Sequence, residues 1–278
     1  MNRLGKTELK VSTIGFGGVI VIGEAPKHAA KLVAEAVEYG INYFDVAPSY
    51  DDAEIKLGPA LKPFRKDVYL ACKTHFRDAK GAKETLEQSL KNLKTDYFDV
   101  YQLHGLTDVE NDVKASFAAG GAMEVILKAK KQGIIRNVGF SAHTPQAAIA
   151  AMKEYDFDTV MYPVNFGLHF KKKWEVQVLK EARKRDMGII ALKALARQKR
   201  PDDKRTTYPK CWYVPIDDPE LARLAFSWTI SQGISVAISP GEEILLKLMM
   251  KILPKCKKPN DREIQKLSSI AEKYEPIF

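Results

Sequence analysis

Four ionisable side chains in the first half of the chain stand at the ends of short apolar runs. Asp45 and Tyr50 lie in FDVAPSY, Lys73 lies in ACKTH, and His104 lies in YQLHG. A tyrosine is a weak acid near neutrality, because its unperturbed pKa is about 10. A nearby ammonium lowers that pKa, and a carboxylate beside the ammonium keeps it charged when both are buried. A neutral imidazole can orient a carbonyl oxygen, so the four types together predict a site that donates a proton to a carbonyl compound.

Each of these residues also has an ordinary structural interpretation when it is considered alone. Asp45 could cap a turn, Lys73 could reach solvent, Tyr50 could pack with its hydroxyl exposed, and His104 could be a structural histidine. The combination favours a site, because neighbouring strands of a barrel bring their ends together. A second chemical interpretation is a lysine-dependent aldolase, in which Lys73 forms a Schiff base with a carbonyl substrate. No metal site is predicted, because four histidines lack the regular spacing of metal ligands: His75, His104, His143 and His169.

Short apolar runs alternate with amphipathic segments along the chain. The eight runs are Ser12–Gly17, Ile41–Val46, Val68–Cys72, Phe98–Leu103, Ile135–Phe140, Thr159–Tyr162, Gly188–Leu192 and Ile234–Ile238. Several are nearly continuous, which is typical of strands buried on both faces. The segments with helical spacing are Ala29–Tyr39, Lys83–Leu93, Ala122–Gln132, a helix beginning at Pro145, Trp174–Arg185, Pro219–Ser231, Glu242–Leu253 and Asp261–Tyr274. This order predicts an α/β fold, a (β/α)₈ TIM barrel that forms one domain over residues 1–278.

An open, doubly wound sheet is the structural competitor of the barrel. Its dinucleotide-binding form carries a glycine fingerprint after the first strand. Here that turn reads Gly15-Phe16-Gly17-Gly18 and lacks a third glycine at the required spacing, so the sequence favours the barrel.

A long segment after the seventh apolar run, Ala196–Asp218, has no regular periodicity and holds three prolines. Loops of this length are often lids or binding loops. Trp212 and Tyr213 lie in it, and two interpretations stay open: they form an apolar wall over a substrate, or they fill a hydrophobic seam. The loop Gly105–Gly121 is the other expected source of substrate specificity.

The composition is that of an ordinary globular protein. The 278 residues are 45% hydrophobic and 28% charged, and 44 Lys and Arg against 35 Asp and Glu give a formal charge of +9. No run of about 18 apolar residues and no secretory signal is present, so we expect a cytoplasmic protein without a membrane partner. Three cysteines without a C-x-x-C pair predict neither a disulfide framework nor a structural zinc.

The positive charge gathers at Lys171–Lys173, between Arg197 and Arg205, and between Lys247 and Arg262. Basic stretches can bind nucleic acid, but no zinc knuckle, RRM signature or helix-turn-helix pattern accompanies them. We therefore expect a solvated surface that attracts anionic cofactors or substrates, and no nucleic-acid partner. A salt-dependent binding titration would reveal the alternative.

The motifs together resemble those of the aldo-keto reductases over nearly the full length of the chain. The resemblance is carried by RLGKTELKVSTIGFGG, FDVAPSY, ACKTH, YQLHG, GFSAH, YPVNF and YEPIF. It implies an N-terminal β-hairpin and NAD(P)H-dependent reduction of a small-molecule aldehyde or ketone. Tyr50 would be the general acid, Lys73 and Asp45 would tune it, and His104 would orient the carbonyl. Regulatory subunits that bind the cofactor with little turnover are the alternative within the same fold.

The resemblance also implies a set of cofactor-binding positions, namely Gly18, Asp45, Ser141, Asn165, Lys193 and Gly241. Two positions depart from the family pattern. Met161 stands where many members have Gln, and Leu192 stands where many have a Tyr that stacks on the nicotinamide. An ammonium at Lys193 is expected to bind the pyrophosphate.

The segment after the eighth apolar run bears on the choice of cofactor. The family usually places basic residues there to hold the 2′-phosphate of NADP, but Gly241 is followed by Glu242 and Glu243. Carboxylates repel a phosphate and can accept hydrogen bonds from an unphosphorylated ribose. Lys247 and the overall positive charge favour NADP(H). We therefore expect NADP(H) as the nominal cofactor with weak discrimination, so that NAD(H) also works.

Overall fold

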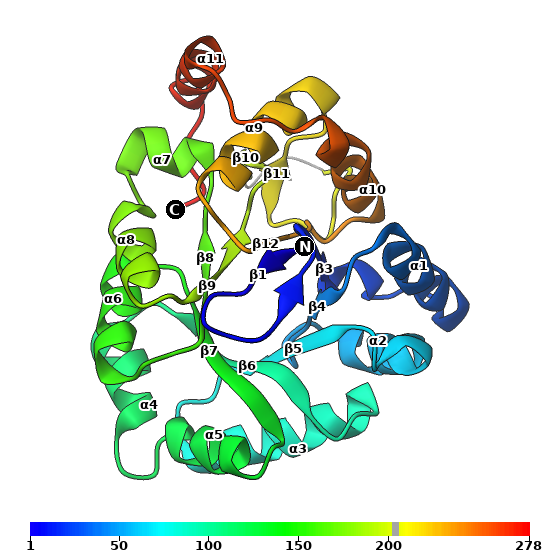
Figure 1. Cartoon of the computed structure of the whole chain (residues 1–278), viewed down its shortest axis with the longest axis vertical. Helices are drawn as coiled ribbons and strands as arrows, with labels where there is room; N and C mark the ends of the chain where they lie inside the picture. The colour runs from blue at the N-terminus through cyan, green and yellow to red at the C-terminus, as the bar shows by residue number, and fades with distance from the viewer. Residues whose placement is uncertain (202–205) are drawn as a thin grey trace.

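Residues 1–201 and 206–278 are described by the computed structural model. Eight parallel strands pair in the order β12-β3-β4-β5-β6-β7-β8-β9 and close into a barrel, with helices around it (Figure 1). The barrel strands are β3 (Ile14–Gly17), β4 (Tyr43–Asp45), β5 (Tyr69–Thr74), β6 (Phe98–Leu106), β7 (Ile135–Ala142), β8 (Thr159–Pro163), β9 (Gly188–Leu192) and β12 (Val236–Ile238). The barrel predicted from the eight apolar runs is confirmed.

Every helix that the periodicity predicts is present. The helices are α1 (Pro26–Tyr39), α2 (Ala53–Leu61), α3 (Ala79–Leu93), α4 (Ala115–Phe117), α5 (Ala122–Lys131), α6 (Pro145–Glu154), α7 (Phe166–Lys172), α8 (Val176–Lys184), α9 (Pro219–Ser231), α10 (Glu243–Ile252) and α11 (Asp261–Ala271). Their boundaries follow local chemistry: the Thr144 hydroxyl accepts the Ala147 N–H at 3.2 Å where Pro145 begins α6. Within the described part of the chain, none of these helices has both the length and the apolar character to cross a membrane.

The periodicity predicts neither the three-residue α4 nor the longer α2 and α7. Pro59 lies inside α2, and a proline normally interrupts a helix. The seven residues of α7 include part of the basic Lys171–Lys173 run, so its apolar face is short. Both helices follow loops at the carboxyl ends of strands, where they fix the loops that carry Tyr50 and Asn165.

An N-terminal hairpin closes the amino-terminal end of the barrel. Strands β1 (Asn2–Arg3) and β2 (Lys10–Val11) pair antiparallel and lie across the centre of the ring of strands in Figure 1. Leu4, Leu9 and Val11 belong to the apolar cluster inside the barrel, which also contains Tyr43, Val100 and Ile190. The hairpin that the resemblance implies is therefore present, and its apolar side chains fill the barrel axis.

The segment after β9 is more regular than the sequence predicts. Strands β10 (Ala196–Lys199) and β11 (Tyr213–Pro215) form an antiparallel hairpin within the expected irregular loop. The prediction of an irregular connection is wrong at these two places, because strands of four and three residues are too short to form an apolar run that the sequence would reveal. Asp202, Asp203, Lys204 and Arg205, part of a charged run noted in the sequence, lie outside the described residues.

Candidate active site

Four side chains that the sequence singles out lie together at the carboxyl ends of the barrel strands. Asp45 ends β4, Lys73 lies near the end of β5, His104 lies near the end of β6, and Tyr50 lies between β4 and α2. Asp45, Tyr50 and His104 line a cavity of about 320 Å³. Lys73 is fully buried and forms an ion pair with Asp45.

Tyr50 lies between this ion pair and the imidazole. The Lys73 ammonium lies 5.4 Å from the centroid of the Tyr50 ring. The rings of Tyr50 and His104 meet edge to face, with their centroids 5.8 Å apart. A phenol and an imidazole therefore meet at the cavity, with the buried Lys73 cation near the phenol, and a carbonyl group there can receive a proton and a hydrogen bond.

The attraction within the ion pair opposes the effect of burial on both members. Burial still raises the pKa of Asp45, although the Lys73 ammonium works against this shift. Burial lowers the pKa of Lys73, but the attraction of Asp45 and Tyr50 overcomes this effect and the pKa is raised. A Schiff-base lysine needs a neutral amine, so this pairing disfavours the aldolase interpretation.

Tyr50 and His104 are both held in their neutral forms. Burial raises the pKa of Tyr50, and the opposing charge of Lys73 does not reverse the shift. Lys73 therefore acts on Tyr50 as expected, but it does not bring the pKa below its ordinary value, because desolvation of the phenolate outweighs it. Burial and the positive charge of Lys73 hold the pKa of His104 well below its usual range. A protonated phenol and a neutral imidazole are the forms that a general acid and a carbonyl-orienting group require.

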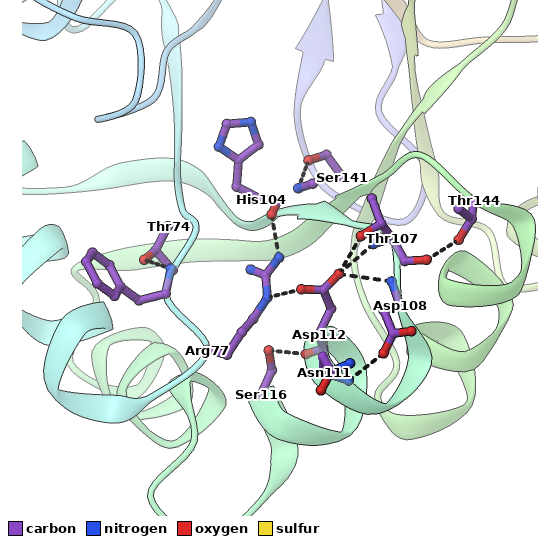
Figure 2. A network of polar contacts seen from close by, with 12 residues as sticks. Thr74, Arg77, His104, Thr107, Asp108, Asn111, Asp112, Ser116, Ser141 and Thr144 are labelled. Atoms are coloured by element: carbon purple, nitrogen blue, oxygen red, sulfur yellow. Dashed lines mark hydrogen bonds and ion pairs between the residues drawn. The ribbon is translucent and has the colours of Figure 1, made fainter. Parts of the chain in front are cut away.

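Ser141 and Gly241 line the same cavity, as do the two residues that depart from the family pattern, Met161 and Leu192. The Ser141 hydroxyl oxygen accepts the Gly105 N–H at 2.7 Å (Figure 2). Because this bond uses a lone pair of the oxygen, the hydroxyl proton stays available to donate to a ligand. A buried hydroxyl in this state fits an acceptor such as a carboxamide oxygen.

Lys193 lines the cavity in an unusual backbone conformation. Its φ of 65° lies in the left-handed region, which is uncommon for a residue with a side chain. Its ammonium lies 4.9 Å from the ring centroids of both Trp212 and Tyr213. Burial lowers the pKa of Lys193 to about 8, so the group is still largely protonated at neutral pH.

Asn165 is not brought into the cavity. Its side-chain amide donates to the carbonyls of Lys193 at 2.9 Å and Ala196 at 2.6 Å, and its oxygen accepts the Leu168 N–H at 3.2 Å. These bonds cap α7 and hold the left-handed turn of Lys193. The amide therefore supports the backbone of Lys193, and Asn165 does not itself line the cavity.

Gly18 is also absent from the residues that line the cavity. A Cβ at this position would lie 2.8 Å from the backbone oxygen of Asp45, so close packing against β4 accounts for the glycine. Trp212 and Tyr213 both line the cavity, with the Trp212 side 49% exposed and Tyr213 buried. Both residues line the cavity, as the wall interpretation requires, and Tyr213 also packs in an apolar cluster, as the seam interpretation requires, so the wall over a substrate stays a prediction.

Two ionisable residues that line the cavity, His143 and Lys210, are missing from the predicted site residues. His143 lies two positions after Ser141, and its Nδ1 is buried without a partner among the described residues. Burial lowers the pKa of His143 to about 4, so this imidazole is neutral. The alternation of β7 could have indicated its orientation toward the cavity. Lys210 lines the cavity from the segment before β11. No local sequence pattern predicts that this lysine reaches the cavity.

A second hollow adjoins the cavity beyond Gly241 and is rich in carboxylates. Lys210 pairs with Glu24 at 2.7 Å, and its backbone N–H donates to Glu242 at 2.7 Å. Lys247 pairs with Glu243 at 2.6 Å and with Glu35 at 3.4 Å. Lys247, which was expected to reach a phosphate, is thus already held by two carboxylates.

A family model described as the aldo/keto reductase family matches residues 13–244. The chain belongs to the aldo/keto reductase family. Among the solved structures, the holo form of the aldo-keto reductase AKR11C1 from Bacillus halodurans shares the fold. It has a TM-score of 0.75 and 23% identity, over 96% of this chain and 95% of that chain.

Two curated relatives come from Bacillus subtilis. The uncharacterized oxidoreductase YqkF is 32% identical over 173 residues, which are 57% of this chain and 54% of that protein. The aldo-keto reductase YhdN is 28% identical over 216 residues, which are 70% of this chain and 61% of that protein. The chain therefore spans little more than half the length of these relatives in the matches.

Proposed function

We propose that this aldo/keto reductase reduces an aldehyde or ketone to an alcohol with a reduced nicotinamide cofactor. The observation that carries the proposal is the placement of protonated Tyr50 between the Lys73–Asp45 ion pair and the neutral ring of His104. Membership of the family and the position of the cavity at the carboxyl ends of the strands support it.

Each residue has a separate task in this proposal. His104 donates a hydrogen bond to the carbonyl oxygen and orients it toward Tyr50. Tyr50 gives its hydroxyl proton to that oxygen as negative charge develops there. Lys73, held by Asp45, stabilises the phenolate that Tyr50 becomes. The nicotinamide, when bound, supplies the hydride that attacks the carbonyl carbon.

The residues around the cavity fit the nicotinamide and pyrophosphate portions of such a cofactor. The Ser141 hydroxyl keeps a proton to donate, and Lys193 presents a cation without a carboxylate within salt-bridge distance among the described residues. Asp45 and Gly241 complete the cofactor side of the cavity. We assign the binding of the nicotinamide carboxamide to Ser141 and the binding of the cofactor pyrophosphate to Lys193.

The adjoining hollow does not fit a 2′-phosphate. Its two lysines, Lys210 and Lys247, are already paired with carboxylates, and Glu242 adds a further negative charge. A phosphate there would meet like charges at close range. We therefore expect a weaker preference for NADP(H) over NAD(H) than the family resemblance implies. NADPH should bind no more than about tenfold tighter than NADH, a difference in binding free energy of about 1.4 kcal/mol.

A tryptophan-fluorescence titration with NADH and NADPH, followed by a panel of aldehydes, tests the function. We expect saturable binding and loss of the reduced-nicotinamide absorbance on addition of substrate. Saturable binding without turnover across the panel would instead indicate the regulatory-subunit alternative. The lack of binding by either cofactor would overturn the proposal.

Replacing Glu242 should change the choice between the two cofactors. Glu242→Arg should shift the binding ratio toward NADPH by about 1 kcal/mol or more, because a partly exposed charged hydrogen bond replaces a repulsion. Glu242→Gln keeps an oxygen for the Lys210 N–H and should shift the ratio less, in the same direction. Dissociation constants for NADH and NADPH measure the effect. Glu84→Gln, on the exposed face of α3, serves as the control. A ratio unmoved by both Glu242 variants would show that this carboxylate does not face the ribose.

The low pKa of Lys193 should make cofactor binding pH-dependent. A group with a pKa of about 8 is charged below pH 8 and loses its charge as the pH rises through that value. The affinity for NADH should therefore fall about tenfold from about pH 7 to about pH 9. Lys193→Arg should bind NADH with little change over this range, whereas Lys193→Met should bind weakly throughout. An affinity of the wild-type protein for NADH that stays unchanged at alkaline pH would contradict the assignment of the pyrophosphate to Lys193.

A further inference from the structure

The end of strand β6 is held by side chains as well as by the sheet. The pairing of β6 with β7 is regular up to Leu103 and shifts register before Leu106. Gly105 lies within this irregularity with a φ of 67°, a left-handed conformation that suits glycine. His104 therefore stands where the ladder is interrupted, and regular strand pairing does not by itself fix its backbone.

Arg77 supplies the missing contact from the neighbouring loop after β5. Its Nη2 donates to the main-chain carbonyl of His104 at 2.8 Å, and its Nε donates to Asp112 Oδ1 at 2.9 Å (Figure 2). The guanidinium is planar and rigid, so two bonds made by different nitrogens also fix its orientation. The carbonyl of His104 thus has a partner whose own position is determined.

Asp112 connects Arg77 to the turn that follows β6. It lies in the π-helical turn η3 (Val109–Lys114), and its Oδ2 accepts the N–H of Thr107 at 2.7 Å and of Asp108 at 3.0 Å. Burial raises the pKa of Asp112, but these N–H groups and Arg77 outweigh it and lower the pKa to about 2. The carboxylate is therefore charged at any pH at which the enzyme would be assayed.

We propose that Arg77 and Asp112 are positioning residues that set the orientation of the His104 imidazole toward Tyr50 and the carbonyl substrate. This inference rests on the proposed reductase function for its kinetic consequences. Neither side chain lines the cavity, so both act through the backbone of residues 104–108 and not by contact with a ligand. A small displacement of a catalytic group can lower turnover about a hundredfold, which gives the pair a measurable role.

A second arginine–aspartate contact on the same strand provides a matched control. Asp99, near the start of β6, pairs with Arg65 at 3.0 Å. The Arg65 side chain is 12% exposed and that of Arg77 is 16% exposed, so the two arginines are similarly buried. Arg65→Met should therefore cost comparable stability at the end of β6 that is remote from the cavity.

The kinetic test is a double-mutant cycle between Arg77 and His104, run with saturating NADH and one aldehyde. We expect Arg77→Met to lower kcat between about tenfold and a hundredfold in the wild-type background, and less than about threefold in the His104→Ala background. Arg77→Lys keeps the charge but cannot make both hydrogen bonds in the geometry of a guanidinium, so its loss of kcat should be nearly as large. Asp112→Asn should show a smaller loss of kcat. Arg65→Met should leave kcat close to wild type.

A second readout does not depend on turnover. NMR of protein labelled in its histidines, with the His104 signals assigned from His104→Ala, should show shifted or broadened His104 resonances in Arg77→Met and unchanged ones in Arg65→Met. Equal loss of kcat in both backgrounds, or His104 signals that stay as in wild type, would overturn the positioning role. Wild-type protein that binds NADH but reduces no aldehyde would instead contradict the proposed function, while the NMR comparison would still decide the role of Arg77.

Discussion

Replacing Tyr50 with phenylalanine should lower reductase turnover by about 10²–10⁴-fold and leave cofactor binding close to normal. The substitution keeps the ring that meets His104 edge to face and removes only the hydroxyl proton. Positioned acid catalysis has an effect of this size when the acid is lost and its surroundings stay in place.

Single-turnover rates with bound reduced cofactor measure the chemical step of Tyr50→Phe directly. A fluorescence titration of the same variant with NADH provides the control for binding. Turnover equal to that of wild type would exclude Tyr50 as the proton donor. The proton would then have to come from water or from His104.

Removing one member of the Lys73–Asp45 pair should damage both turnover and stability. Lys73→Met leaves a buried carboxylate without its cation, and Asp45→Asn leaves a buried ammonium without its anion. Breaking a buried ion pair from one side costs about 3–5 kcal/mol of folding free energy. Each single variant should also lower kcat by at least about tenfold. Lys73→Met removes the charge that stabilises the Tyr50 phenolate, and Asp45→Asn removes the carboxylate that holds this charge in place.

The double variant Lys73→Met/Asp45→Asn separates a shared network from two independent effects. Since neither buried charge remains in it, it should unfold at a denaturant concentration no lower than the less stable single variant. Its loss of kcat should be much smaller than the product of the two single losses. Chemical denaturation and steady-state kinetics of the three variants make the comparison. Multiplicative losses of kcat would contradict a unit formed by the two residues.

Those parts of the fold and site that depend on local patterns could be predicted from the sequence. The nearly continuous apolar runs indicated buried strands, and their order along the chain indicated a parallel barrel. Asp45, Lys73 and His104 could be grouped because each follows such a run, and the barrel geometry places strand ends together.

Features that depend on contacts between distant segments could not be predicted in this way. The bond from Arg77 to the carbonyl of His104 joins residues 27 positions apart, and neither residue type reveals it. Asn165 looked like a cofactor ligand because it is an amide in the right motif, yet the turn after β9 uses its hydrogen bonds. Lys247 is expected to reach a phosphate, but the sequence does not show that α1 brings Glu35 beside it in addition to Glu243.

The N-terminal hairpin closes one end of the barrel. Leu4, Leu9 and Val11 pack in the apolar cluster at this end, and the cavity that contains Tyr50 is lined by Trp212 among others. In the proposed reaction, the substrate, the alcohol product and the proton that restores Tyr50 all pass through this cavity. A bulky compound lodged against Trp212 would therefore slow both entry and exit, and would inhibit the enzyme without touching the catalytic side chains.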